Sequence, residues 1–458
     1  MRDRLRHPTR RVIAVLALAG LALGVVVAIA LSGGGGGKGD GKAASPPPAD
    51  RPVASRSFLE QVIPVRGAAL PGAAVPTQIA ATVRAMSEQD KVAQLMLLGY
   101  KGSGSTGPVL ARLRRRPLGG IVIRSSNYTS DDQLTAIAGR ATNAARHAHG
   151  YPPLIWAPQE GGDFSAIPSA GPADPPGSIG SARRAAHHAA ASGRSLASLN
   201  LNGVLAPVID VGTEDATDPL GPRAYSHEPS AVAAFGVAAV VGYKRAGVMS
   251  AVEHFPGLGA ATQSPDNGPT SVGLSLDQLR KRDLVPFAAA IGAGVPAVVI
   301  SNASYATDDF VTPGTLSKAV STDLLRGEMR FRGVAVADDL SQPAITTSMS
   351  VADAAVQAIA AGCDMVYISG PKRGQEAAYR ALLQAVRRGA ISHARLDEAV
   401  TRILTMKREY GLVRGLRPQT KVSSVAPGVT TPVAPTPVAP PTTTPVQPST
   451  QTGGAPAP

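Results

Sequence analysis

Eight short runs of mostly apolar residues recur through the middle of this 458-residue chain, and amphipathic segments separate them. Such runs are typical of strands that are buried on both faces. Because strand and helix alternate, the pattern predicts an α/β fold with a parallel sheet, and eight units fit a closed (β/α)8 TIM barrel. A doubly wound open sheet is the alternative. The strands are expected near 94–98, 119–123, 154–157, 204–208, 249–252, 297–301, 334–337 and 365–368, with helices including 276–293, 317–332 and 352–361.

The amino-terminal segment has the pattern of a membrane anchor. Residues 1–11 contain five arginines, and an apolar run of about 20 residues follows at 12–31, which is long enough to cross a bilayer as a helix. The basic flank predicts a cytoplasmic segment at 1–11, a transmembrane or signal-anchor helix at 12–31, and the remainder outside the cytoplasm as a single-pass protein of the cell membrane. The alternative is secretion after cleavage of a signal peptide near Ala28–Ala30.

Composition divides the rest of the chain. A Gly/Ala/Pro-rich linker is expected at 32–74, the barrel at 75–415 and a Pro/Thr-rich disordered tail at 416–458. The net charge of +13 favours anionic partners, but no nucleic-acid motif is present, so we expect no nucleic-acid partner and a monomer. Cys363, the single cysteine, excludes an intramolecular disulfide and is expected to be a buried thiol. No cysteine cluster suggests a metal site, and no cofactor is expected.

Two strand ends carry chemically active residues. The run at 334–337 stops at Asp338 and Asp339, and the carboxyl ends of barrel strands are where catalytic groups face a pocket. An Asp pair that caps the next helix would also explain these residues. A second segment, 253–259 (E-H-F-P-G-L-G), also follows an apolar stretch and adds an acid and a histidine.

These segments, together with 159–162 (Q-E-G-G), 205–210 (L-A-P-V-I-D) and 221–225 (G-P-R-A-Y), resemble the bacterial β-N-acetylglucosaminidase branch of the family 3 glycoside hydrolases. The motifs occur in the family's order over roughly residues 90 to 415. The resemblance implies hydrolysis of O-glycosidic bonds, in a β-N-acetylhexosaminide or a cell-wall glycan, by a retaining mechanism without a cofactor. It also implies a carbohydrate partner, such as a peptidoglycan-derived glycan, and identifies Asp338 as the nucleophile.

The acid/base side departs from the family pattern. In that branch, the loop after K-H-F-P-G-H-G supplies an Asp-His dyad that exchanges the proton. Here Asp266 matches the Asp of the dyad, Gly268 stands in place of its His, and Leu258 replaces the motif's second His. Asp266 and Glu253 are therefore the acid/base candidates, because a carboxyl group with a raised pKa performs this role in most glycosidases. Glu160 is a further possible proton donor.

The sugar-binding side is also changed. The resemblance implies substrate contacts from Arg223, His254 and Glu160. The family's Asp before Q-E-G-G is Pro158 here, and its Lys before His is Glu253, so specificity for N-acetylglucosamine does not follow. The alternative function is a noncatalytic glycan- or protein-binding pseudoenzyme on the same barrel.

Overall fold

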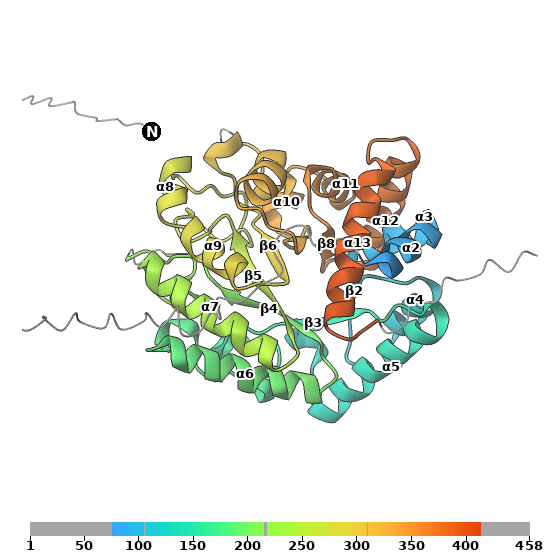
Figure 1. Cartoon of the computed structure of the whole chain (residues 1–458), viewed down its shortest axis with the longest axis horizontal. Coiled ribbons are helices and arrows are strands. Elements are labelled where there is room, and N and C mark those ends of the chain that lie inside the picture. The colour runs from blue at the N-terminus through green and yellow to red at the C-terminus, as the bar shows by residue number, and fades with distance from the viewer. Residues whose placement is uncertain (1–75, 105–106, 215–217, 309, 414–458) are drawn as a thin grey trace, which may run out of the picture. The chain divides into compact units, whose positions relative to one another are not determined.

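The computed structural model describes residues 76–413, apart from 105–106, 215–217 and 309, and these residues contain a closed eight-stranded parallel barrel (Figure 1). Consecutive strands pair in sequence order, and pairing of the first strand with the last closes the barrel. The barrel prediction is confirmed and the open-sheet alternative is wrong. The strands are β1 (Met96–Leu98), β2 (Gly120–Val122), β3 (Leu154–Pro158), β4 (Gly203–Val208), β5 (Met249–Phe255), β6 (Ala297–Ile300), β7 (Val334–Ala337) and β8 (Met365–Ile368).

Helices surround the sheet (Figure 1). Several begin after a serine whose hydroxyl accepts a hydrogen bond from the backbone N–H three residues on, as Ser130 does for α5 and Ser392 for α13. Such caps stabilise a helix by about 1 kcal/mol each. The α-helices are α2 (Thr77–Ala85), α3 (Glu88–Gln94), α4 (Pro108–Arg115), α5 (Asp131–His149), α6 (Ala182–Ser198), α7 (Pro229–Arg245), α8 (Leu276–Lys281), α9 (Leu284–Gly292), α10 (Pro343–Thr346), α11 (Val351–Ala361), α12 (Lys372–Arg387) and α13 (His393–Glu409).

Three predicted elements differ from the structure. The helix expected over 276–293 is broken into α8 and α9, because Pro286 has no backbone N–H for the carbonyl of Arg282 and its ring would clash there. At the break, Arg282 donates hydrogen bonds to the carbonyls of Val211 and Gly212, both at 2.7 Å. The segment expected over 317–332 forms a shorter π-helix, η8 (Ala319–Glu328). The first strand is also shorter than expected, since Gln94 ends α3.

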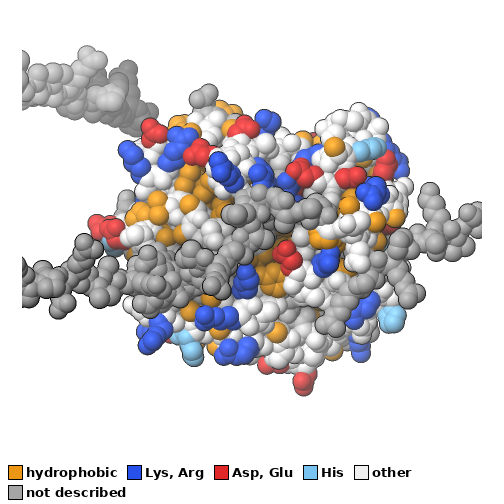
Figure 2. Space-filling view, viewed as in Figure 1, with side chains coloured by type: hydrophobic (Ala, Val, Ile, Leu, Met, Phe, Trp, Pro, Cys, Tyr) orange, Lys and Arg blue, Asp and Glu red, His pale blue; other side chains and the backbone are white. Residues whose placement is uncertain are grey.

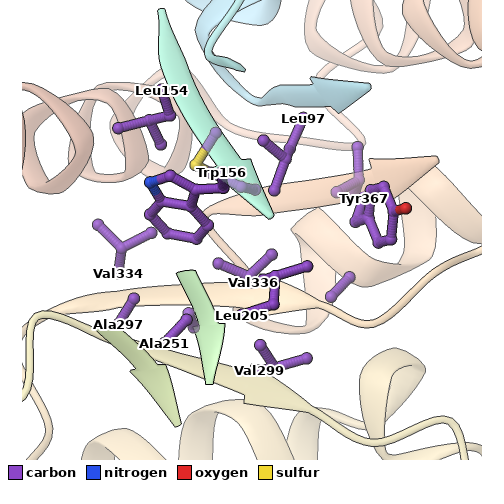
Figure 3. Packing of buried hydrophobic residues seen from close by; sticks show 14 of the residues in the cluster. Leu97, Leu154, Trp156, Leu205, Ala251, Ala297, Val299, Val334, Val336 and Tyr367 are labelled. Atoms are coloured by element: carbon purple, nitrogen blue, oxygen red, sulfur yellow. The ribbon is translucent and has the colours of Figure 1, made fainter. Parts of the chain in front are cut away.

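The core fills the inside of the barrel and the layer between strands and helices. Figure 3 shows the side chains inside the barrel, where the indole ring of Trp156 lies among smaller aliphatic residues. Because aromatic residues make up only 4% of the chain, alanine, valine and leucine supply most of the packing. Helices α6 and α7 approach closely where Gly242 lies, since a Cβ there would be 2.5 Å from the carbonyl oxygen of Ala186.

The predicted anchor at 12–31, the linker at 32–74 and the tail at 416–458 lie outside the described residues. None of the described helices is long and apolar enough to cross a membrane. Residues 76–413 contain 32 Lys and Arg against 28 Asp and Glu, a net charge of +4, so most of the total of +13 belongs to the two ends of the chain. On the face in Figure 2, basic side chains are scattered among acidic and uncharged ones.

Candidate active site

The alternation of side chains along the strands brings two carboxyl groups into one mouth of the barrel. Val334 and Val336 of β7 point into the barrel (Figure 3), and a period of two places Asp338 next on the same side. In β5, Ala251 points inward (Figure 3), and Glu253 follows two residues later. Both acids lie at the carboxyl end of the sheet, where barrel enzymes carry their catalytic groups.

His254 is held in place by a buried aspartate from the neighbouring strand end. Asp210 follows β4 and is completely buried, and its Oδ2 lies 2.7 Å from Nδ1 of His254. Its Oδ1 accepts hydrogen bonds from the backbone N–H groups of His254, at 3.0 Å, and Leu258, at 2.8 Å. Although burial lowers the pKa of His254, the Asp210 carboxylate outweighs this effect and raises the pKa to about 9. The imidazole is therefore cationic at neutral pH, and its Nε2 remains available.

Asp338 is partly exposed at this mouth. Its Oδ1 accepts a hydrogen bond from the backbone N–H of Asp339 at 2.7 Å. Burial raises the pKa of Asp338 to about 6, and the positive charge of His254 opposes the rise. Asp339 itself accepts hydrogen bonds at 2.9 Å from the backbone N–H groups of Ser341 and Ser369, so it ties the loop after β7 to the end of β8.

Glu253 is the most deeply buried of the candidate acids, with 6% of its surface exposed. Burial raises the pKa of Glu253 to about 8; His254 lowers it, whereas Glu160 and Asp338 raise it. Its nearest basic atom is Nε2 of His254, 3.9 Å from its Oε2, which is too far for a hydrogen bond. Glu253 is therefore a protonated acid at neutral pH when no ligand is bound.

An open cleft of about 510 Å³ lies at the mouth, between loops that follow β3, β4 and β5. Arg223 forms a two-pronged contact with Glu160, with Nε to Oε2 at 2.6 Å and Nη2 to Oε1 at 3.0 Å. Both oxygens of Glu160 are thus engaged, and its main effect is to orient the guanidinium group. Phe164, 37% exposed, lies beside Arg223 and offers an aromatic surface to a ligand. The lining residues are Glu160, Phe164, Asp218, Pro219, Leu220, Gly221, Pro222, Arg223, Ser264 and Asp266.

The loop at 259–270 carries Asp266 to the rim of this cleft. Its exposed side chain is close enough to raise the pKa of Asp338. Gly268 has a φ of 148°, a conformation that disfavours any residue with a side chain, so a histidine would not fit there without strain. The preceding turn is tightly packed, because a Cβ on Gly259 would meet the carbonyl oxygen of Val211 at 1.7 Å.

Similarity to known proteins extends over most of the barrel. Residues 88–406 match the family model described as the glycosyl hydrolase family 3 N terminal domain. The chain belongs to glycoside hydrolase family 3. A β-hexosaminidase of Stenotrophomonas maltophilia is 31% identical over 338 residues, covering 68% of this chain and 98% of that protein. An uncharacterized secreted glycosyl hydrolase of Arthroderma benhamiae is 30% identical over 339 residues, covering 72% of this chain and 96% of the relative.

Among solved structures, the chain is similar to a family 3 β-N-acetylglucosaminidase from a Paenibacillus species. The TM-score is 0.69 at 31% identity, and the match covers 75% of this chain and 66% of that one. This similarity extends beyond the barrel topology to sequence, and it agrees with the resemblance seen in the motifs. The chain is thus a β-hexosaminidase-like member of family 3.

Sequence reasoning missed several residues of this family 3 site. Asp210 was visible only as part of a motif, although an aspartate two residues after a strand was a signal for the barrel mouth. Phe164 and Asp218 lie in loops that no pattern distinguishes. Cys363 is fully buried, as expected, and burial raises the pKa of its thiol to about 12. Within the described residues, no group of His, Cys, Asp and Glu side chains could hold a metal ion.

Proposed function

We propose that this protein is a retaining glycoside hydrolase that removes a terminal sugar from β-hexosaminides of the cell envelope, such as peptidoglycan-derived glycans. The observation that carries the proposal is the position of Asp338 directly after β7, in line with the inward-facing Val334 and Val336, with a pKa of about 6 that leaves it ionised at neutral pH. The similarity to a β-hexosaminidase over nearly its whole length supports the substrate class.

Asp338 would act as the nucleophile. It attacks the anomeric carbon of the terminal sugar while the bond to the leaving oxygen breaks, and a glycosyl ester forms. A water molecule then attacks the same carbon, releases Asp338 and restores the original anomeric configuration. Arg223, oriented by Glu160, and His254, oriented by Asp210, would donate hydrogen bonds to sugar hydroxyls.

Asp266 is the better candidate for the acid/base. The leaving group of a glycan must extend towards solvent, so the acid that protonates its oxygen should line the open cleft. Asp266 lines that cleft and Glu253 does not. Asp266 would give its proton to the leaving oxygen and later accept one from the attacking water.

The decisive experiment is to trap the nucleophile with a 2-deoxy-2-fluoroglycoside and identify the labelled peptide. Labelling at Asp338, together with a loss of roughly 10⁴-fold or more in kcat for Asp338→Asn, would support the assignment. A label on another acid, or inversion of configuration observed by NMR, would overturn it. Circular dichroism of the variant controls for loss of fold.

The acid/base role is tested by comparing an aryl glycoside with a disaccharide. A nitrophenolate needs little protonation, so Asp266→Asn should slow the disaccharide by about 10²–10⁴-fold and the aryl glycoside much less. Added azide should restore part of the loss on the aryl glycoside by attacking the glycosyl ester. If Glu253→Gln gives this pattern and Asp266→Asn does not, the acid is Glu253.

A noncatalytic glycan-binding protein is the second candidate, and Gly268 favours it, because the loop has no histidine to carry the proton. Retention of a glycan on a binding array, with neither substrate cleaved, would support this candidate. In either case we propose that a monomeric barrel acts outside the cytoplasm, tethered by the segment at 12–31 or released. The secreted relative supports the released form.

A further inference from the structure

The charged groups at the barrel mouth fall into two classes. Four of them form two internal pairs, Glu160 with Arg223 and Asp210 with His254, at contact distances of 2.6 and 2.7 Å. Each pair is close to neutral as a unit, and each holds one loop in place. The positive charges of Arg223 and His254 are therefore largely neutralised by Glu160 and Asp210.

The carboxyl groups of Glu253 and Asp338 share one nearby cation, the imidazolium of His254, which Asp210 already binds and whose Nε2 lies 3.9 Å from Oε2 of Glu253. No hydrogen bond to the carboxyl group of Glu253 is found within the part of the chain that the structure describes, and 94% of this residue is hidden from solvent. The carboxyl oxygens of Glu253 are not among the fully enclosed polar atoms without a partner, so water can reach them in the free protein. A ligand that displaces this water must offer Glu253 a hydrogen-bond donor in its place, because a buried carboxyl group without a hydrogen bond is energetically unfavourable.

We propose that Glu253 selects a terminal sugar that carries a free amine, so that the preferred substrates are β-glucosaminides rather than their N-acetylated forms. This inference rests on the proposed function, because it concerns the sugar bound below the open cleft. An ammonium group brings a positive charge and three N–H donors to an acid that accepts no hydrogen bond from the described side chains and whose nearby cation, His254, is already bound by Asp210. An N-acetyl group brings a single N–H donor and no charge, so Glu253 would have to stay protonated beneath it.

Binding of glucosamine should change the protonation of Glu253. The groups that face Glu253 are His254 from its own strand, Arg223 and Glu160 from the loops after β4 and β3, and Asp338 after β7. In the free protein, these surroundings leave Glu253 protonated at neutral pH. An ammonium ion favours the ionised form, so glucosamine should expel a proton from Glu253 as it binds at pH 7. Neutral N-acetylglucosamine should expel none.

The first test is calorimetric titration of the full chain with glucosamine and with N-acetylglucosamine at pH 7, in two buffers of different ionisation enthalpy. We expect at least tenfold tighter binding of glucosamine, with proton release. Glu253→Gln should abolish that preference and the proton release, while N-acetylglucosamine binding changes less than threefold. Glu228→Gln, which removes an exposed carboxyl group at the start of α7, is the matched control and should behave as the wild type.

The second test uses four substrates, the glucosaminide and the N-acetylglucosaminide, each with a nitrophenyl and with a sugar leaving group. A specificity role predicts that Glu253→Gln slows both glucosaminides whatever the leaving group. Slowing of both sugars only when the leaving group is poor would make Glu253 the acid and overturn the inference.

The two proposals fail in different ways. Cleavage of N-acetylglucosaminides with no preference for glucosamine would refute the inference and leave the hydrolase intact. Glucosamine binding that depends on Glu253, without any cleavage, would refute the hydrolase and leave the amine preference standing. Absence of both binding and cleavage would refute both.

Discussion

Replacing Lys407 with methionine should stabilise the protein near neutral pH. Lys407 of α13 is completely buried, and its Nζ donates a hydrogen bond to Oε1 of Gln94 at 2.9 Å. Burial lowers its pKa from 10.5 to about 7. Each unit of this pKa difference corresponds to ~1.36 kcal/mol. Burying the charged ammonium therefore lowers the free energy of unfolding by roughly 5 kcal/mol at pH values below 7.

The cost depends on pH in a defined direction. Between pH 7 and 10.5 the unfolded chain binds more protons at this lysine than the folded protein does, so the stability of the wild type rises with pH in that window. Methionine removes this dependence but leaves Oε1 of Gln94 without a donor, which costs ~1–3 kcal/mol at every pH. Lys407→Met should therefore be more stable by roughly 2–4 kcal/mol at pH 6, from these two figures, and less stable by ~1–3 kcal/mol above pH 10.5.

Urea unfolding at a series of pH values from 6 to 10.5 measures the difference directly. Lys244→Met makes the same chemical change at an exposed position of α7, so its difference from the wild type should be small and nearly constant. If the difference for Lys407→Met were equally constant across this range, the ammonium would not be destabilised by burial and the reasoning would fail.

Three further predictions concern the site and its support. Below pH 6, kcat/KM on an aryl glycoside should fall about tenfold per pH unit as Asp338 becomes protonated, and a flat profile down to pH 4 would exclude it as the ionised nucleophile. Arg223→Lys should raise KM more than it lowers kcat, because lysine cannot reproduce the two-pronged contact with Glu160, and steady-state kinetics would show the split. Asp364→Asn should destabilise the fold by roughly 3–5 kcal/mol in urea unfolding. The buried Asp364 carboxylate forms ion pairs with Arg326, Arg395 and Arg402, and asparagine would leave these three charges facing a neutral group.

Most of the fold could be predicted because its cause is local. A strand that is buried on both faces needs a continuous run of apolar residues. The run at 334–337 is such a case, and it coincides with β7. The break between α8 and α9 also has a local cause, Pro286, which the amphipathic pattern of 276–293 concealed. The contacts of Arg282 with carbonyls about 70 residues earlier in the chain could not be predicted, because they depend on the closed barrel.

The same distinction applies to the candidate site. Asp338 and Glu253 were identifiable because a strand end fixes where a side chain is placed. The pairing of Asp210 with His254 joins residues 44 positions apart, and that of Glu160 with Arg223 joins residues 63 positions apart. Motifs in the sequence identify these residues one by one. Their pairing could not be predicted, because only the closed barrel brings the loops after β3, β4 and β5 to one mouth.

Under the proposed amine preference, the residues at the mouth that differ from the family pattern reflect a changed ligand rather than simple decay of a family 3 site. A buried ion pair is difficult to lose even without function, because removing one partner leaves an uncompensated charge, so the two retained pairs are uninformative. Glu253 is informative, since drift should replace a buried acid without a hydrogen bond by a neutral residue. Because burial raises its pKa, the folded protein binds more protons than the unfolded chain between pH 4.5 and 8, and Glu253 destabilises the fold increasingly as pH rises through that window. Glu253→Gln should therefore gain stability over the wild type from pH 4.5 to 8 while losing glucosamine binding, as expected where function opposes stability. Urea unfolding that shows no gain at pH 8 would mean that the carboxyl group has a partner in the folded protein, and the reason for assigning it a ligand would disappear.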